Sequence, residues 1–359
     1  MTSVPEVDAV ILVGGLGTRL RPLTLSAPKP MLPTAGVPFL THVISRIREA
    51  GIRHVVLGTS YQAAVFERHF GDGAALGVEL EYVVESEPLG TGGGIRNVAD
   101  RLRGENAMIF NGDILSGVDL RALLTRHHDS AADVTLYLTK VSDPRAFGCV
   151  PTDPNGWVTA FLEKDPDPVT DQINAGAYVF KRAVVEGIPA GRAVSVERET
   201  FPELLASGAR VAGHVDSGYW RDLGRPADFV AGSADLVRGL APSPALPGPV
   251  GEALVLAGAT VDPAATVTGG TTVGAGCTVG AGAVLDGSVL FDGSHVADGA
   301  VVRRSVVGFG ATIGAGTVLE DAVIGDRARI GARVELCGGA RVWPEVELAD
   351  GAIRFSSDL

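Results

Sequence analysis

The C-terminal third of the chain carries an aliphatic residue at nearly every sixth position, and this period constrains the fold more than any other feature of the sequence. Six residues is neither the period of a helix nor the simple alternation of a strand. The spacing shortens to five after Leu285, Val302 and Leu319, which lie 17 residues apart, so one short and two full repeats make one coil. A glycine directly follows several of the aliphatic positions, as tight corners require. The pattern predicts a triangular β-helix. The aliphatic positions are Val255, Val261, Val267, Val273, Val279, Leu285, Leu290, Val296, Val302, Val307, Ile313, Leu319, Ile324, Ile330, Leu336, Val342 and Leu348.

The segment from Asp8 to about Gly239 has a different pattern, in which apolar strand-like runs alternate with helix-like spacing. This alternation is typical of the α/β class. Residues 38–51 place their apolar side chains on one helical face, so we expect a helix there that packs on a sheet. The expected strands are residues 9–13, 54–58, 79–84, 107–110, 134–139, 158–162 and 177–180.

Four prolines within residues 241–250 separate the two patterns, because proline fits the interior of neither regular element. We therefore expect a catalytic domain over residues 1–240, a linker over 241–251, the β-helix over 252–351 and a tail over 352–359. A β-helix exposes the strand edges of its last coil, and residues 353–359 or a neighbouring subunit can cover them. We accordingly expect a homo-oligomer.

Composition excludes several classes of protein. Acidic residues outnumber basic ones by 42 to 30, giving a net charge of −12 with no basic block, which argues against nucleic-acid binding. No apolar run approaches the ~20 residues of a membrane span, and no basic segment precedes an apolar stretch at the start. The three cysteines are far apart in the sequence, which favours a reducing cytoplasm and no zinc site.

A glycine-rich segment follows the first expected strand. It reads Gly14-Gly15-Leu16-Gly17-Thr18-Arg19, and Pro28-Lys29-Pro30 comes soon after. Glycines let backbone N–H groups approach an anion, and the hydroxyl and cationic side chains add donors for phosphoryl oxygens. The segment lacks the last glycine of the dinucleotide-binding fingerprint and the Gly-Lys-Ser/Thr of a P-loop, so neither of those nucleotide sites fits.

These residues resemble the signature of the sugar nucleotidylyltransferases, and the resemblance continues in order along the chain. It is closest to the bacterial mannose-1-phosphate guanylyltransferases. The matching blocks are Glu87 to Gly93, Asn111-Gly112-Asp113, Phe147 to Val150, Phe161 to Lys164, Asn174-Ala175-Gly176 and Trp220-Arg221-Asp222. The resemblance implies a Rossmann-like, mainly parallel sheet domain followed by a left-handed parallel β-helix. It also implies that GTP and mannose 1-phosphate give GDP-mannose and diphosphate by in-line attack on the α-phosphorus, with Mg²⁺ as cofactor.

The same resemblance implies roles for individual residues. Arg19, Lys29, Asp113, Lys164 and Asp222 are expected to be catalytic, and the two aspartates to ligate Mg²⁺ through hard oxygens. Glu87 offers an acceptor to the donors of guanine. The expected nucleotide-binding residues are Leu12, Gly14, Gly15, Gly17, Thr18, Arg19, Lys29, Glu87, Gly90, Thr91 and Asp113. The expected sugar-phosphate-binding residues are Gly148, Glu163, Lys164, Asn174 and Glu197.

Other interpretations stay open from the residue chemistry alone. The substrates can instead be a manno-heptose 1-phosphate with GTP, or glucose 1-phosphate with UTP or dTTP. The chain can also be a regulatory subunit that binds a nucleotide sugar without turnover. This alternative is disfavoured by the retention of all five residues expected to be catalytic, which are Arg19, Lys29, Asp113, Lys164 and Asp222. An acyltransferase activity of the β-helix is disfavoured because His295 is its only histidine. The adjacent His127 and His128 are expected on the surface, and Asp165 to Pro168 in an exposed turn.

Overall fold

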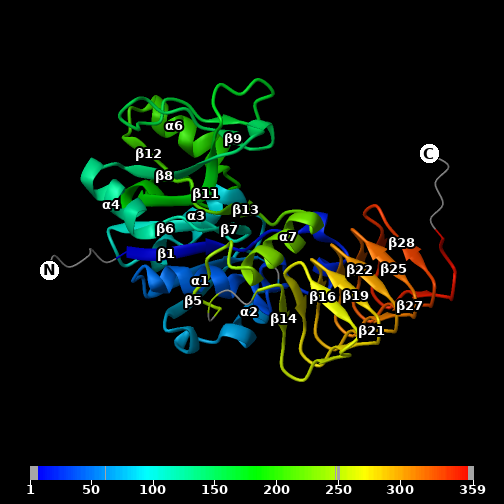
Figure 1. The fold of residues 1–359 in the computed structure, drawn as a ribbon. Helices are drawn as coiled ribbons and strands as arrows, with labels where there is room; N and C mark the ends of the chain where they lie inside the picture. The colour runs from blue at the N-terminus through cyan, green and yellow to red at the C-terminus, as the bar shows by residue number, and fades with distance from the viewer. Residues whose placement is uncertain (1–6, 61, 247, 249–250, 355–359) are drawn as a thin grey trace. The chain divides into compact units, whose positions relative to one another are not determined.

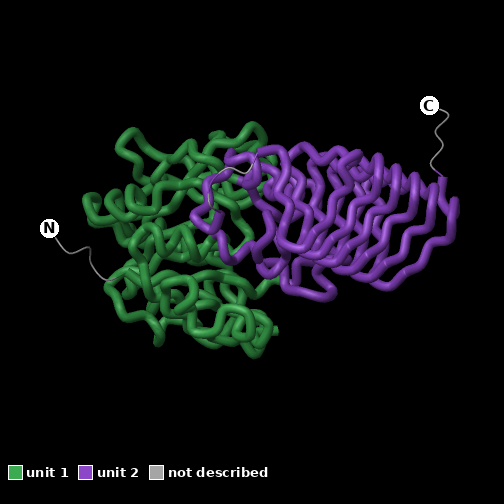
Figure 2. Tube along the Cα trace, turned by 60° about the horizontal axis from the view of Figure 1, so that its bottom comes forward, with its two compact units in different colours: residues 1–15, 43–220 green, residues 16–42, 221–359 purple. Residues whose placement is uncertain are grey.

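A computed structural model describes residues 7–60, 62–246, 248 and 251–354. These residues form two compact units, shown in separate colours in Figure 2. Unit 1 contains residues 1–15 and 43–220, and unit 2 contains residues 16–42 and 221–359. Residues 16–42 and 221–240 thus group with the β-helix, so the compact units cross the domain limits that the sequence predicts.

Unit 1 is built on a mixed sheet (Figure 1). Its parallel half has the order β5-β4-β1-β6, and β11 then pairs antiparallel with β6 and with β8. The predicted α/β class is confirmed, with parallel pairing concentrated in this first half. The strands are β1 (Val7–Leu12), β4 (His54–Thr59), β5 (Glu79–Val84), β6 (Asn106–Asn111), β7 (Ile114–Ser116), β8 (Val134–Lys140), β9 (Gly148–Cys149), β10 (Leu162–Glu163), β11 (Gln172–Lys181) and β12 (Val211–Val215).

The α-helices come between these strands or follow them in the chain. They are α1 (Phe39–Glu49), α2 (Ala63–Phe70), α3 (Gly90–Asn97), α4 (Leu120–Ser130), α5 (Arg182–Gly187), α6 (Phe201–Ala206) and α7 (Pro226–Val237). Short 3₁₀ turns are η1 (Thr18–Leu20), η2 (Leu23–Leu25), η3 (Lys29–Met31), η4 (Ala74–Leu76), η5 (Ala99–Arg101) and η6 (Pro144–Ala146), and η7 (Val196–Thr200) is a π-helix. No helix among the described residues is long and apolar enough to cross a membrane.

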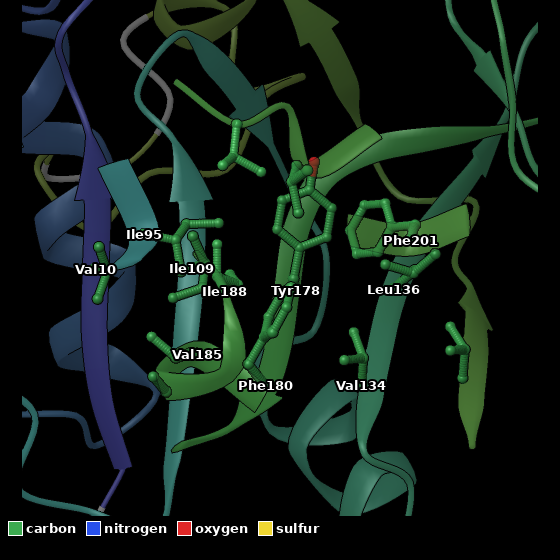
Figure 3. Close-up of a cluster of buried hydrophobic side chains, with 14 of the residues drawn as sticks. Val10, Ile95, Ile109, Val134, Leu136, Tyr178, Phe180, Val185, Ile188 and Phe201 are labelled. Carbon is green, nitrogen blue, oxygen red and sulfur yellow. The ribbon is translucent and has the colours of Figure 1, made fainter. Parts of the chain in front are cut away.

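The core of unit 1 holds its strands in place and is drawn in Figure 3. Three fully buried aromatic rings, Tyr178, Phe180 and Phe201, pack with centroids 5.3 to 6.0 Å apart. Val10 of β1 and Ile109 of β6 belong to the same cluster. The strands that carry the candidate site therefore share one apolar core, which fixes their ends relative to one another.

Two local predictions in unit 1 are wrong. Residues 158–162 do not form a strand: Val158 makes only an isolated bridge to Thr152, and β10 begins at Leu162. His127 is buried rather than on the surface, with its ring nitrogens bonded to Thr135 and Asn106, and burial lowers its pKa to about 4. His127 follows the buried Leu120, Leu123 and Leu124 at helical spacing, so it lies on the inner face of α4.

Unit 2 contains the β-helix that the repeat predicts (Figure 1). Three parallel sheets stack strands from successive coils, in the orders β14-β17-β20-β23-β26-β29, β15-β18-β21-β24-β27-β30 and β16-β19-β22-β25-β28. Register partners such as Leu290 and Val307, or Val296 and Ile313, occupy the same predicted column. These sheets fit a left-handed β-helix.

Within unit 2 the strands of the β-helix follow the repeat closely, and three further strands lie outside it. The strands of unit 2 are β2 (Pro33–Thr34), β3 (Val37–Pro38), β13 (Trp220–Asp222, whose first residue belongs to unit 1), β14 (Ala253–Val255), β15 (Thr260–Val261), β16 (Thr266–Thr268), β17 (Thr271–Val273), β18 (Thr278–Val279), β19 (Val284–Asp286), β20 (Val289–Leu290), β21 (His295–Val296), β22 (Val301–Arg303), β23 (Val306–Val307), β24 (Thr312–Ile313), β25 (Val318–Glu320), β26 (Val323–Ile324), β27 (Arg329–Ile330), β28 (Glu335–Leu336), β29 (Arg341–Val342) and β30 (Glu347–Leu348).

The ends of the β-helix depart from the repeat. Val255 is 47% exposed although it holds a predicted core position, because the first coil has a neighbour on one side only. At the other end the N–H of Glu335 donates to the carbonyl of Ile353, so the tail pairs with part of the last edge. Residues 355–359 of the expected tail, and Pro247, Pro249 and Val250 of the expected linker, lie outside the described residues.

A buried charge network joins three strands of the parallel half. His54 Nδ1 lies 2.7 Å from Asp8 Oδ1, and His54 Nε2 lies 3.0 Å from Glu81 Oε1. Because carboxylate oxygens accept, both ring nitrogens donate, which requires the doubly protonated imidazolium. The bond to Asp8 raises the pKa of His54 above its ordinary value of 6.5.

This network predicts a pH dependence of stability. His54 binds its proton more tightly in the folded chain, so its stabilisation is full below pH 6.5 and is lost as the pH rises through the folded pKa. Thermal melting of H54Q should show a midpoint about 2–4 °C lower than that of the wild type at pH 6, with the difference shrinking towards pH 9. H69Q, which changes an exposed histidine, is the control. A constant difference between H54Q and the wild type across this range would contradict the assignment.

Candidate functional site

The carboxyl ends of β1 and β6 lie side by side and carry the first group of predicted site residues. Leu12 of β1 is in register with Asn111 of β6. Gly112 donates its N–H to the carbonyl of Leu12 at 2.9 Å, and a Cβ on Gly112 would lie 2.5 Å from that oxygen. Only glycine permits this approach, which brings the half-buried Asp113 next to the end of β1. Gly14 and Gly15 continue from β1 at the same edge.

Glu85, which sequence reasoning missed, lies beside this glycine turn, with its Oε2 3.8 Å from where a Cβ on Gly14 would be. Its Oε2 accepts from the N–H of Leu89 at 3.3 Å, and its Oε1 lies 2.7 Å from where a Cβ on Gly94 would be. Burial raises the pKa of Glu85 above the ordinary carboxyl value. The predicted Glu87 has an exposed side chain. The sequence did contain a signal for Glu85. This residue directly follows β5, as Gly14 closely follows β1, and both strands end at the same edge of a parallel sheet.

Helix α3 holds the predicted Gly90 and Thr91, and its glycines serve a close backbone contact. The N–H groups of Gly92 and Gly93 both lie within hydrogen-bonding distance of the Val194 carbonyl, at 2.9 and 3.3 Å. A Cβ on Gly93 would lie 2.7 Å from the carbonyl oxygen of Arg192. The segment that leads into the π-helix η7 therefore lies directly against α3. Thr91 and the predicted Glu197 meet at this contact, with Thr91 Oγ1 2.7 Å from Glu197 Oε2.

The hairpin of β9 and β10 places three predicted sugar-side residues together. Glu163 is in register with Gly148, and a Cβ on Gly148 would lie 2.9 Å from Glu163 Oε2. Lys164 follows with φ of 54° and donates its N–H to the carbonyl of Phe147. Its Nζ lies 3.7 Å from Glu163 Oε1, and its side chain is 60% exposed. An exposed ammonium beside a partly buried carboxylate can bind an anion that carries hydroxyl groups.

A bulge in β11 positions Asn174, the remaining predicted sugar-side residue. The register with β8 shifts between Asn174 and Tyr178. Asn174 Nδ2 donates to the Tyr178 hydroxyl at 2.8 Å, and Asn174 Oδ1 accepts from the N–H of Gly176 at 3.2 Å. The Trp220 indole N–H donates to the carbonyl of Ala175 and closes the bulge from outside. Bulges re-aim side chains beside active sites, as this one does for Asn174.

Unit 2 holds a second group of predicted residues. Lys29 Nζ lies 3.8 Å from Asp222 Oδ1, and both side chains are mostly buried. The Arg19 guanidinium lies against Gly224, where a Cβ would come within 2.7 Å of it and 3.0 Å of Asp222 Oδ1. Two cations and one carboxylate therefore meet within this unit. This combination suits a phosphorylated ligand and its counter-ion.

The signature loop (residues 16–32) is fixed to the outside of the β-helix. Its predicted Gly17 has φ of 58°, and its carbonyl accepts from the Thr24 hydroxyl, while Thr18 is exposed. The loop and α7 bury apolar side chains against the outer face of the sheet that contains β20, β23 and β26. The cluster consists of Leu20, Leu23, Leu32, Phe229, Val230, Val289, Phe291, Val306 and Val323.

The two predicted metal ligands, Asp113 and Asp222, offer hard carboxylate oxygens from different units. Neither belongs to a close group of three or more His, Cys, Asp or Glu donors, and the one such group among the described residues is His54, Glu79 and Glu81. Arg103 already pairs with both of those glutamates. A donor set of one or two carboxylates fits Mg²⁺, which keeps water and substrate phosphates as its other ligands.

Comparisons with known proteins found matches to both parts of the chain. The family described as nucleotidyl transferase matches residues 8–239, and the GMPPB C-terminal domain matches residues 249–353. A mannose-1-phosphate guanylyltransferase of Mycobacterium tuberculosis is 65% identical over 355 residues, which cover 99% of each chain. The catalytic subunit beta of the Drosophila melanogaster enzyme is 38% identical over 69% of each chain. The crystal structure of HddC from Yersinia pseudotuberculosis complexed with GMP-PN has a TM-score of 0.56 and 28% identity, covering 64% of this chain and 99% of that one.

The contact between α3 and residues 192–196 predicts that two glycine substitutions will differ. G93A should lower the free energy of unfolding by about 1–3 kcal/mol, because the new methyl group meets a backbone carbonyl. This clash outweighs the ~1 kcal/mol that alanine gains over glycine in a helix. G15A is the control, since nothing lies within 4 Å of a Cβ there, and its stability should stay within about 0.5 kcal/mol of the wild type. Urea unfolding measures both, and equal stability of the two variants would argue against the contact.

Proposed function

The chain belongs to the nucleotidyl transferase family, and we propose that it is an enzyme that joins GTP and α-D-mannose 1-phosphate into GDP-mannose and releases diphosphate. The observation that carries this function is the 65% identity with a mannose-1-phosphate guanylyltransferase over 99% of both chains. The second family match, to the GMPPB C-terminal domain, covers the β-helix as well. The proposed assignment of this activity is therefore supported by similarity over the whole length of the chain and not by the catalytic motifs alone.

The reaction that we propose needs no covalent intermediate on the protein. An oxygen of the sugar phosphate attacks the α-phosphorus of GTP in line, a new P–O bond forms, and the bond to the β-phosphate oxygen breaks with diphosphate as the leaving group. Two polyanions must meet on a protein of net charge −12, so local cations have to offset their repulsion. Electrostatic stabilisation is accordingly the main demand on the site.

Three cations can meet this demand. Arg19 would bind the departing diphosphate, since its guanidinium is exposed beside Gly224. Lys29 would neutralise charge near the α-phosphate, because its mostly buried ammonium is held beside Asp222. Lys164 would bind the incoming sugar phosphate from its exposed position after β10. The neighbouring Gly148, Glu163 and Asn174 would face the sugar hydroxyls.

We also propose Mg²⁺ as the cofactor, held by Asp113 and Asp222. The carboxylate oxygens of these residues match the preference of Mg²⁺ for hard ligands. When bound, the ion would offset negative charge on the triphosphate. Gly112 and Gly224 allow the close approaches that leave Asp113 beside the end of β1 and Asp222 beside Arg19.

The guanine base, in our proposal, meets Glu85. The carboxylate of Glu85 lies between Gly14 and Gly94. Guanine offers an N1–H and an exocyclic amine as adjacent donors, which a carboxylate can accept together. The half-buried position of Glu85 makes these bonds stronger than those of an exposed acid such as Glu87.

Cellular location and assembly remain proposals. We propose that the enzyme is cytoplasmic. The three cysteines are free, and Cys149 and Cys277 are buried, which fits a reducing compartment because such a compartment keeps thiols reduced. The homo-oligomer expected from the β-helix edge also stays a prediction.

Diphosphate release by the purified protein tests the proposed function. We expect the highest kcat/KM for GTP with mannose 1-phosphate when GTP, ATP, UTP and dTTP are crossed against mannose, glucose and manno-heptose 1-phosphates in Mg²⁺. D113N should lower kcat at least ~100-fold, because it removes charge from a proposed metal ligand. D129N, in an exposed position on α4, is the matched control.

Each contrary result has a distinct meaning. A preference for another substrate pair would keep the reaction class and replace the substrates. No diphosphate release with any pair, together with tight binding of GDP-mannose, would favour the regulatory subunit. Full activity of D113N would remove Asp113 from the metal site.

Base selectivity tests Glu85. E85Q should lower kcat/KM for GTP about 30-fold and lower that for UTP much less. The substitution replaces one of the two acceptor oxygens by an NH₂ donor group, so the side chain no longer accepts both guanine bonds. The raised pKa of Glu85 adds a pH effect. As the solution is acidified, the KM of the wild type for GTP should rise when Glu85 becomes protonated. This rise should begin at a higher pH than for a carboxyl group with an ordinary pKa, and E85Q should not show it. E87Q is the control, and a loss of GTP selectivity in E87Q alone would assign the base contact to Glu87.

A further inference from the structure

The hydroxyl of Thr91 connects the helix on the nucleotide side to a carboxylate on the sugar side. Thr91 is the second residue of α3. Its Oγ1 donates to Glu197 Oε2 at 2.7 Å and accepts from the N–H of Val196 at 2.9 Å. Residues 91 and 197 are 106 positions apart in the sequence, so this contact depends on tertiary structure.

The chemistry of a hydroxyl limits what else Thr91 can do. A threonine side chain has one O–H donor, and here that donor is directed at Glu197. Phosphate oxygens only accept hydrogen bonds, so a nucleotide phosphate cannot bind this hydroxyl without breaking the bond to Glu197. The side chain of Thr91 therefore serves the carboxylate rather than the triphosphate.

Glu197 is held from two directions at one of its two oxygens. Its Oε2 accepts from Thr91 and also from the Ser195 hydroxyl at 2.8 Å. Among the residues that the structure describes, both of these bonds go to Oε2, which leaves Oε1 with acceptor capacity for a ligand. Two hydroxyl groups that donate to one carboxylate oxygen fix the orientation of the whole carboxylate group, and this sets the direction in which the second oxygen points.

The backbone around Glu197 is braced in the same way. Glu197 lies in the π-helix η7, and π-turns occur frequently at functional sites. Ser195 caps this turn through its hydroxyl, which accepts from the N–H of Arg198, while the N–H of Ser195 donates to Glu199 Oε1. Arg192 holds Glu199 in turn through a 2.9 Å ion pair. Together with the bonds from α3 to Val194, these contacts leave little freedom to the backbone of Glu197.

The surroundings place Glu197 with the sugar-side group. The fully buried Tyr178 hydroxyl accepts from Asn174, and burial raises the pKa of Tyr178, with the charges of Glu197 and Glu163 acting in the same direction. Both carboxylates are thus close enough to Tyr178 to act on it electrostatically. Glu163 adjoins Gly148 and Lys164 on the β9–β10 hairpin, so Glu197 and this group of residues both lie near Tyr178.

We propose that Thr91 is a positioning residue for the sugar: its hydroxyl, with that of Ser195, holds the Glu197 carboxylate so that Oε1 accepts a hydrogen bond from a hydroxyl group of the sugar phosphate. This inference rests on the proposed function, because it assumes that a nucleotide sugar forms at this site. It assigns Thr91 to sugar recognition, although its helix belongs to the nucleotide side. The ligand chemistry is a vicinal polyol, which offers the donor that a carboxylate oxygen requires.

Binding of GDP-mannose and GDP tests the proposal without relying on turnover. The ratio of their dissociation constants reports what the sugar adds to affinity. In T91V, which keeps the shape of the side chain and removes the hydroxyl, GDP-mannose should bind about tenfold more weakly, while the affinity for GDP stays within about twofold. T91S retains a hydroxyl and should restore most of the sugar contribution. Steady-state kinetics should show the same split, with a raised KM for mannose 1-phosphate and an unchanged KM for GTP.

A double-mutant cycle separates positioning from general damage. If Thr91 acts through Glu197, T91V in an E197Q background should weaken GDP-mannose binding by less than about twofold more. S195A removes the second donor to the same oxygen and should reproduce part of the T91V effect. The melting temperature of each variant identifies any that fail to fold, and in that case T91S and S195A carry the test.

The results that overturn the proposal are specific. If T91V weakens the binding of GDP and of GDP-mannose equally, Thr91 contributes to nucleotide binding and not to sugar binding. If the effects of T91V and E197Q on the affinity for GDP-mannose are fully additive, Thr91 does not act through Glu197. Failure of the proposed function looks different, because the wild type itself would then fail to bind GDP-mannose or to release diphosphate with mannose 1-phosphate. The Thr91 variants would in that case be compared on the nucleotide sugar that the wild type does bind, with its nucleoside diphosphate as the reference.

Discussion

The packing of the signature loop on the outer face of the β-helix is the contact on which the positions of Arg19 and Lys29 depend. Leu20, Leu23 and Leu32 of the loop are at most 1% exposed, and they share a core with Phe229 of α7 and Phe291 of the β-helix. Burying a side chain of this kind contributes about 1.5–3 kcal/mol. Arg19 lies directly before Leu20, and Lys29 comes three residues before Leu32. The β-helix therefore holds the segment that carries both cations.

This contact also shows which features of the β-helix can be predicted from the six-residue repeat and which cannot. The inward aliphatic column was visible as a six-residue period, and the structure confirms it from Val273 to Val342. The outward neighbours of these positions carry a second signal, which the six-residue period of the inward column does not include. On the sheet of β20, β23 and β26 they are Val289, Val306 and Val323, all buried, whereas on the sheet of β21 and β27 they are His295 and Arg329, both exposed. An apolar outer column predicts that something covers that face, but it cannot identify the loop, because the partners are some 260 residues apart in the sequence.

Single residues in unit 1 show the same division between local and long-range information. The strands β4, β5 and β6 were predicted to within a residue or so, since their apolar runs are bounded by turn residues. The run at 158–162 has the same local pattern and forms no strand, because Val158 finds only an isolated bridge. Glu85 and Glu87 look alike in the sequence, yet Leu89 and Gly94 enclose the first and leave the second exposed. Which of the two acids is enclosed depends on how α3 packs, and the sequence does not contain that information in a local form.

The start of α3 is rich in glycine, a poor helix former, although this helix sets the positions of nearby acidic side chains. Glycine weakens a helix by about 1 kcal/mol relative to alanine, and α3 has four glycines within its first five residues. Three of them, Gly90, Gly92 and Gly93, are needed because Arg192 and Val194 approach too closely for a side chain, and the Val194 carbonyl accepts from the helix directly. Gly94 leaves room for the Glu85 carboxylate instead. The helix thus gains from tertiary contact what it lacks in propensity. The same approach brings Glu197 to Thr91 on one side of α3, while Glu85 meets Gly94 further along it. One short helix therefore sets the positions of the acids proposed to recognise the base and the sugar, so the two recognition events share a single structural support.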